Sequence, residues 1–414
     1  MSIIKKYPNG LRVVITPIEG LLSVSCGILV KTGSVNENNK ENGISHFIEH
    51  NLFKGTKNRT SFEISDEIDR IGAQINAFTS KELTCYYTKS TAEHFEKSFE
   101  ILSDIFCNSI FDSTELEKEK GVVLEEINMS EDTPEDLCLD LLAKSYYGNK
   151  GLGRTILGKA SNIKNFTRED IINYLDKYYV PENIVISIAG KVDTQKATDV
   201  IEKYFVLNIK DKKGSKQIKS LAINRQNNLF KYKKIEQSHI AYCFNGTNMF
   251  NENSDSLAIA NIVFGGGMSS RLFQKIREEL GLAYSVYSYA SQYKHSGVIE
   301  IYAGVNTQER DKASDSIIKE LINFSKNGIT KDEFFRGKEQ IKSSFILGQE
   351  SGASQMILYG KYLLFLNKLF NFDYRINMID KVTFDNVNEV IKNHFILDNI
   401  STATVGPLKK PLTI

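Results

Sequence analysis

The chain of 414 residues contains no tryptophan, only six prolines and only five cysteines. The cysteines are odd in number and include no Cys-x-x-Cys pair, so we expect reduced, buried thiols rather than a disulfide framework. An excess of one charge is also missing, because 52 Lys and Arg residues stand against 51 Asp and Glu residues. A dedicated nucleic-acid-binding protein normally carries a clustered basic excess, which excludes that class.

Long hydrophobic runs are missing too. The longest apolar stretch without a charge is 21–30, and it includes two serines and a glycine. A membrane-spanning helix needs about twenty apolar residues, so no membrane span is expected. The N-terminal segment also lacks the apolar core and the small-residue cleavage site of a secretory signal. These absences predict a cytoplasmic protein without a membrane contact.

The chain contains an internal repeat. Residues 167–190 align without gaps to residues 383–406, at a constant offset of 216 positions. Each copy starts with Thr in the N-cap position, continues as an amphipathic helix and ends as an apolar strand closed by Gly. The repeat predicts two related α+β domains, 1–210 and 229–414, joined by the polar, Lys-rich linker 211–228.

Turn chemistry and hydrophobic periodicity place further elements. Asn9-Gly10 between two apolar stretches predicts a β-hairpin, because a type I′ turn needs a positive φ at both central positions. Residues 23–31 alternate with apolar side chains on one side, which predicts a half-buried strand. The period becomes helical from Gly43, and 270–280 predicts a further helix that ends before a glycine.

Two of only six histidines lie in the segment His46-Phe47-Ile48-Glu49-His50. On a helix, positions i, i+3 and i+4 project from one face, so His46 and His50 can hold one metal ion while Glu49 reaches the same space. Two neutral imidazoles suit a divalent ion such as Zn²⁺, although Mn²⁺ or Co²⁺ could occupy the same ligands. A catalytic zinc site also needs a third protein ligand and an open position.

The best source of a third ligand is 115–128, an expected helix rich in Glu. Glu119 and Glu126 share one face of it, whereas Glu125 points about 100° away from Glu126. We predict Glu126 as the ligand, with Glu125 as the alternative, and Glu119 beside the site, where it orients a histidine or the metal-bound water. Taken alone, such carboxylates are typical of a solvated helix face. The presence of the histidine pair elsewhere in the chain makes a metal-binding role the favoured interpretation.

These residues resemble the H-x-x-E-H motif of the inverted-motif zinc peptidases, the family of pitrilysin and insulin-degrading enzyme. The branch that the chain resembles is that of mitochondrial processing peptidase and its bacterial homologues. Glu126 stands 76 residues after His50, in a stretch similar to the one that carries the family's third ligand. Asn51 departs from the pattern, since relatives usually carry an apolar residue there. The resemblance covers nearly the whole chain and includes the segments 9–13, 72–79 and 265–273.

The resemblance implies a fold and a chemistry. Each domain is expected to be a mostly antiparallel sheet covered by helices, a duplicated α/β roll that forms half of a clam-shell chamber. His46, His50 and Glu126 would bind one zinc ion per chain, which polarises the scissile carbonyl and activates water, and Glu49 would be the general base. The expected protein is a zinc-dependent metalloendopeptidase that acts on peptides or unfolded segments enclosed in the chamber.

A peptide substrate must be held in an extended form. The stretch 74–79 could be an exposed strand edge that pairs with the substrate through main-chain hydrogen bonds. The resemblance singles out Asn76 and Ala77 in this strand as substrate contacts, with Phe78 beside them.

Arg277 and Tyr284 are similar to a pair that the family uses to hold substrate and to stabilise the charged tetrahedral intermediate. The single-chain members of the family have four domains and this chain has two, so we expect a homodimer with composite active sites. The alternative is a non-catalytic structural or partner subunit of a processing-peptidase-like complex, although such subunits have usually lost motif residues. A metal-dependent hydrolase of another bond type is disfavoured, because the strand edge and the Arg/Tyr pair suit a polypeptide.

Overall fold

The structure, a computed structural model, describes residues 2–209, 227–398 and 400–412. The chain divides into two compact units. The first comprises the described parts of 1–127, 155–219 and 346–371, and the second those of 128–154, 220–345 and 372–414.

The expected domains are continuous halves of the chain, 1–210 and 229–414. Each compact unit additionally takes in a segment from the other half, 346–371 in the first unit and 128–154 in the second. Of the expected linker 211–228, only Asn227 and Asn228 lie within the described residues.

A six-stranded sheet forms the centre of the first unit. Its strands are β1 (Ile3–Lys6), β2 (Arg12–Pro17), β3 (Ser23–Val30), β4 (Gln74–Thr79), β5 (Thr84–Thr91) and β6 (Ile184–Gly190). They lie in the order β1-β2-β6-β3-β5-β4, with β2 and β6 parallel and all other neighbours antiparallel. The hairpin predicted at Asn9-Gly10 is confirmed by the antiparallel pairing of β1 with β2.

The second unit contains a five-stranded sheet. Its strands are β7 (Asn228–Tyr232), β8 (Gln237–Asn245), β9 (Ala283–Gln292), β10 (Gly297–Asn306) and β11 (Ser401–Gly406). The order β7-β11-β8-β10-β9, with only β7 and β11 parallel, is that of the first sheet without β1. The predicted class, α+β with two related and mostly antiparallel sheets, is confirmed.

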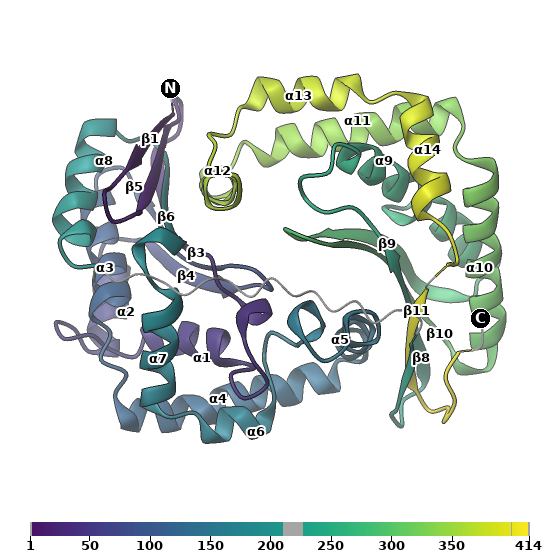
Figure 1. Cartoon of the computed structure of the whole chain (residues 1–414), viewed down its shortest axis with the longest axis horizontal. Coiled ribbons are helices and arrows are strands. Elements are labelled where there is room, and N and C mark those ends of the chain that lie inside the picture. Colours follow the sequence, from purple (N-terminus) through teal and green to yellow (C-terminus); the bar gives the residue numbers. More distant parts are fainter. Residues whose placement is uncertain (1, 210–226, 399, 413–414) are drawn as a thin grey trace. The chain divides into compact units, whose positions relative to one another are not determined.

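Helices surround both sheets (Figure 1). They are α1 (Ile44–Leu52), α2 (Ser61–Arg70), α3 (Phe95–Asn108), α4 (Ser113–Asp132), α5 (Pro134–Tyr147), α6 (Ala160–Asn165), α7 (Arg168–Tyr178), α8 (Thr194–Ile201), α9 (Ser254–Gly265), α10 (Arg310–Asn327), α11 (Lys331–Gly348), α12 (Gly352–Leu366), α13 (Phe372–Lys381) and α14 (Phe384–His394). The helix predicted within 270–280 includes a π-helical segment, Phe273–Glu279. None of the helices in the described ranges combines the length and the apolar character that a membrane crossing requires.

The two copies of the repeat form the same local structure. Both α7 and α14 begin with a capping box, formed by Thr167 with Asp170 and by Thr383 with Asn386. Each helix leads into a buried strand, β6 or β11, that pairs in parallel with the first long strand of its sheet. The local sequence signals of the repeat therefore coincide with equivalent positions in the two sheets.

The second face of each sheet is covered by a helix from the other half of the chain. In the first unit α12 packs on β6, β3 and β2, and in the second α5 packs on β11 and β8. The Ser187 hydroxyl of β6 donates a hydrogen bond to the Met356 carbonyl of α12 at 2.7 Å. The thiol of Cys138 in α5, fully buried, lies 3.5 Å from the His239 carbonyl of β8.

The helix α12 corrects one sequence prediction. The alternation in 23–31 predicts a half-buried strand, but β3 is buried on both faces. Leu29 belongs to a core cluster with Met356 and Leu363 of α12. At Gly27 the helix comes so close that a Cβ atom would lie 2.2 Å from the Met356 sulfur. The strand is thus sandwiched, because a distant segment supplies a second apolar cover.

Candidate metal centre

Helix α1 places His46, Glu49 and His50 on one half-buried face. Its N-terminus is capped by the fully buried carboxylate of Glu37, which accepts a hydrogen bond from the main-chain N–H of Gly43 at 2.8 Å. A carboxylate at this end is favourable because the helix dipole is positive there. The opposite face of the helix packs into the core through Ile44, Phe47, Ile48 and Leu52.

Glu126 of α4 completes a cluster with the two histidines. Its Oε2 atom lies 3.6 Å from Nε2 of His46 and 3.4 Å from Nε2 of His50. One ligand atom from each of the three residues fits within 4.8 Å of the others. Ligand atoms about 2.0–2.2 Å from a tetrahedral zinc ion lie roughly 3.3–3.6 Å apart. The donor set and its spacing therefore fit a zinc ion with an open fourth position.

The electrostatic environment favours a metal-binding form of His46. Burial, together with the neighbouring His50, lowers the pKa of His46 to about 4, so its imidazole is neutral at physiological pH. Burial also lowers the pKa of His50, but the carboxylates of Glu119, Glu126 and Glu49 outweigh it and raise that pKa. The site thus combines a neutral imidazole with one whose neighbouring carboxylates favour a positive charge.

Glu119 lies behind His50, on the side away from the cluster. Its Oε1 atom lies 2.9 Å from Nδ1 of His50, and its Oε2 atom lies 2.8 Å from Nζ of Lys54. Glu119 is only 4% exposed, and these contacts hold its pKa below the usual value although burial opposes them. A hydrogen bond at Nδ1 fixes the ring orientation and leaves Nε2 for a metal ion.

Glu49 points toward the end of β4. The Thr79 hydroxyl, on the last residue of that strand, donates a hydrogen bond to Oε2 of Glu49. Burial raises the pKa of Glu49, while the Thr79 hydrogen bond and the charge of His50 oppose this shift. Thr79 and Lys54 are the two contacts of the site that the sequence motifs did not reveal.

Two neighbours of the predicted ligands lie outside the cluster. Glu125, the alternative third ligand, is exposed and does not belong to the group of metal-spaced side chains. Asn51 is 1% exposed, and its amide donates a hydrogen bond to the Phe47 carbonyl at 2.7 Å. Asn51 therefore faces the core of the unit and bonds to its own helix.

The strand that carries the expected substrate contacts lies at a sheet edge. Among the described strands β4 pairs only with β5. Asn76 is exposed, and its side-chain oxygen accepts a hydrogen bond from the main-chain N–H of Ala77 at 2.8 Å. Phe78 is half-buried and packs edge-on against Tyr87 of β5, with ring centroids 6.4 Å apart.

The second expected pair, Arg277 and Tyr284, lies in the other compact unit. Both side chains are exposed, Tyr284 to 78%. The Arg277 guanidinium carbon lies 5.6 Å from the centre of the Tyr284 ring, and Arg277 also lies over Phe273 at 4.7 Å. The two residues are thus neighbours on the surface of the second unit.

The fold and the metal-spaced cluster together define a zinc peptidase of the inverted-motif type, and comparison with known proteins identifies the family. The model of the insulinase family, peptidase family M16, matches residues 12–160, and that of the M16 inactive domain matches residues 165–341. The uncharacterized zinc protease YmxG of Bacillus subtilis is 41% identical over 98% of each chain. An uncharacterized zinc protease of Rickettsia felis is 36% identical over 98% of this chain and 97% of its own.

The chain belongs to the insulinase family of zinc proteases, M16. Solved structures agree on the fold. A protease from Helicobacter pylori matches with a TM-score of 0.91, at 24% identity, over 98% of this chain and 99% of its own. An M16 inactive-domain protein from Pseudomonas fluorescens has the same TM-score at 18% identity, with both chains covered completely.

Proposed function

We propose that this zinc protease is an endopeptidase that cleaves peptides or unfolded segments, with one zinc ion per chain held by His46, His50 and Glu126. The observation that carries the proposal is the convergence of these three side chains beside Glu49, which Thr79 joins to the end of β4, an edge strand among the described strands. A bound zinc ion supplies Lewis acidity, which polarises a carbonyl group and acidifies water.

Glu49 is the group that moves the proton. Its carboxylate accepts a proton from the attacking water and delivers it to the leaving amine, as a general base and then a general acid. Its hydrogen bond from Thr79 occupies Oε2, so the carboxylate has a fixed orientation and Oε1 is the atom left for the water. Burial raises the pKa of Glu49, which makes the carboxylate a stronger base than an exposed Glu.

Substrate binding follows from the free edge of β4. An extended peptide can add to this edge as a further strand, so main-chain hydrogen bonds supply affinity with little dependence on sequence. Asn76 and Ala77 are the proposed main-chain contacts, and the half-buried Phe78 helps to hold the strand in place. Thr79 connects this strand directly to Glu49, so a substrate paired with β4 runs toward the proton acceptor.

The second unit would contribute charge stabilisation. We propose that Arg277 and Tyr284 hold substrate and stabilise the negative charge that develops on the carbonyl oxygen. Their exposure leaves guanidinium and phenol donors available for such contacts. In the proposed homodimer, which restores four domains around a closed chamber, the pair acts on the zinc of its own chain or of the partner.

The purified full-length chain tests this proposal. Zinc content is measured together with hydrolysis of a quenched fluorescent peptide library, for the natural protein and for Glu49→Gln. About one zinc per chain, with cleavage lost in the variant, is the expected result. Stoichiometric zinc without cleavage would instead favour a partner-requiring or structural subunit, and a chain that binds no zinc would overturn the ligand assignment.

A further inference from the structure

Lys54 follows the helix that carries the histidines and reaches back to Glu119. Its Nζ atom lies 2.8 Å from Oε2 of Glu119, whose Oε1 atom lies 2.9 Å from Nδ1 of His50. We propose that Lys54 is a positioning residue: through Glu119 it holds the His50 imidazole in the orientation that binds the metal. This inference rests on the proposed metal site.

The two oxygens of Glu119 are divided between two partners. A carboxylate that is held at both oxygens cannot rotate, and the hydrogen bond to Nδ1 then fixes the plane of the His50 ring. His50 in turn presents Nε2 to Glu126, 3.4 Å away. Partners of a ligating histidine set its tautomer and direction, so their own anchors contribute to metal affinity.

The burial of Glu119 makes its contact with the Lys54 ammonium group important. The Glu119 side chain is 5% exposed and that of Lys54 is 31% exposed, so the carboxylate depends on protein partners while the lysine also reaches solvent. Removing one partner of a buried ion pair leaves an uncompensated charge, which is strongly destabilising for that arrangement. Without Lys54, Glu119 would keep only the histidine as an anchor among these three groups, and the ring would lose its fixed geometry.

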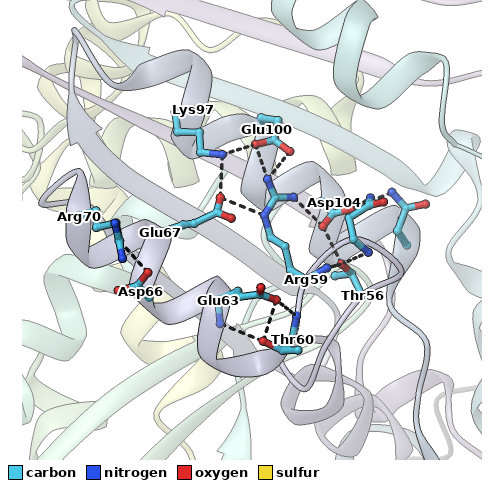
Figure 2. A network of polar contacts seen from close by, with 12 residues as sticks. Thr56, Arg59, Thr60, Glu63, Asp66, Glu67, Arg70, Lys97, Glu100 and Asp104 are labelled. Carbon is cyan, nitrogen blue, oxygen red and sulfur yellow. Dashed lines mark hydrogen bonds and ion pairs between the residues drawn. The ribbon is translucent and has the colours of Figure 1, made fainter.

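Neighbouring cations are placed differently. Arg59 bonds to Glu100 and Asp104 at 2.8 Å, in the network that Figure 2 shows. Lys57, three positions after Lys54, is exposed. Lys57 therefore offers a matched control, since its removal takes away the same charge from the same loop without touching Glu119.

The experiment measures the zinc affinity of the full chain by competition with a chromogenic chelator. We expect Lys54→Met to weaken zinc binding by about tenfold, the lower end of the range for partners of metal ligands. Lys57→Met should bind zinc like the natural protein, and Lys54→Arg should retain more affinity than Lys54→Met. Excess zinc should restore the peptidase activity of Lys54→Met, which a purely structural defect would not allow.

Equal zinc affinities for Lys54→Met and Lys57→Met would overturn the inference. If Lys54→Met does not fold, Lys54→Gln replaces it, with the same expected direction and the same contradicting result. A natural chain that binds no zinc would defeat the proposed function as well. A natural chain that binds zinc and cleaves peptides, with unchanged affinity in the Lys54 variants, would defeat only the role of Lys54.

Discussion

The two compact units share a strand order but differ in the polar contact between the edge strand and the helix that packs against it. In each unit a helix that precedes the edge strand in the sequence packs against that strand, α1 against β4 and α9 against β9. In the first unit Thr79 donates to the carboxylate of Glu49. In the second, Ser288 donates to the side-chain amide oxygen of Asn261 at 2.9 Å, a neutral pair.

The surroundings of these two contacts differ as well. The first unit adds two histidines and Glu126, the one metal-spaced group in the part of the chain that the structure describes. At Gly265 in the second unit, a Cβ atom would lie 2.4 Å from the Ser288 hydroxyl, so helix and strand are close-packed there. Both units thus share a strand order, whereas the side chains of the metal-spaced group lie on α1 and α4 of the first unit.

Removal of the metal has the largest expected effect, because it should abolish the chemistry that distinguishes the first unit from the second. Chelation is expected to abolish peptide hydrolysis, because the substrate carbonyl then loses its Lewis acid, and added zinc should restore it. Glu126→Gln should mimic chelation by removing one ligand, whereas Glu125→Gln should retain zinc and activity. Zinc content and hydrolysis are measured on the same samples, and full activity in Glu126→Gln would contradict the ligand set.

Glu49→Gln replaces the charged partner of Thr79 by a neutral amide, like that of Asn261, the partner of Ser288 in the second unit. General acid–base catalysis typically contributes about 10²–10⁴-fold, so kcat should fall by that factor. Zinc binding should persist, since Glu49 is not part of the metal-spaced group. Steady-state kinetics and metal analysis check this, and loss of zinc together with activity would show that the variant disturbs the site rather than the proton transfer.

Thr79→Val and Ser288→Ala each remove a hydroxyl that donates from an edge strand to the helix packed against it, one in each unit. The Thr79 hydroxyl fixes the orientation of the Glu49 carboxylate, and misplacement of a catalytic group can cost up to about 10²-fold, so Thr79→Val should lower kcat by about tenfold or more. Thr79→Ser, which retains the hydroxyl, should recover most of the rate. Ser288→Ala should leave kcat and KM unchanged. A loss of kcat in Ser288→Ala as large as that in Thr79→Val would contradict the assignment.

The smallest expected effect concerns stability and its dependence on pH. Asp104 in the first unit bonds to Thr56 and Arg59 (Figure 2), and Glu333 in the second bonds to Arg271. Burial raises the pKa of each carboxyl, but these hydrogen bonds outweigh it and hold the folded-state pKa below the usual value. The native state thus binds fewer protons than the unfolded state, so this stabilisation is present above the unfolded pKa and is lost in acid.

Asp104→Asn and Glu333→Gln should each lower the free energy of unfolding by about 2 kcal/mol at pH 7. The difference from the natural protein should shrink as the pH falls below about 4, through the unfolded and then the folded pKa. Urea unfolding at several pH values checks this for both units. A difference that stays constant down to pH 3 would contradict the proposed role of the ionised carboxylates.

Local signals in the sequence predicted much of the fold. The Thr capping boxes, the Asn9-Gly10 hairpin and the repeat at 167–190 and 383–406 depend on neighbours in the chain, so they can be recognised without a structure. The burial of β3 on both faces could not be predicted, because its second cover, α12, lies more than 300 residues away in sequence. The exchange of α5 and α12 between the halves is invisible for the same reason.

The metal site shows the same contrast between local sequence signals and long-range packing. The common face of His46 and His50 could be predicted from the sequence, because helical periodicity places residues four apart on one face. The folded unit was needed to see that Glu126 reaches the histidines and Glu125 does not, and that Thr79 contacts Glu49 while Lys54 contacts Glu119. Periodicity is a property of one helix, whereas these contacts join segments whose approach is set by the packing of the whole unit.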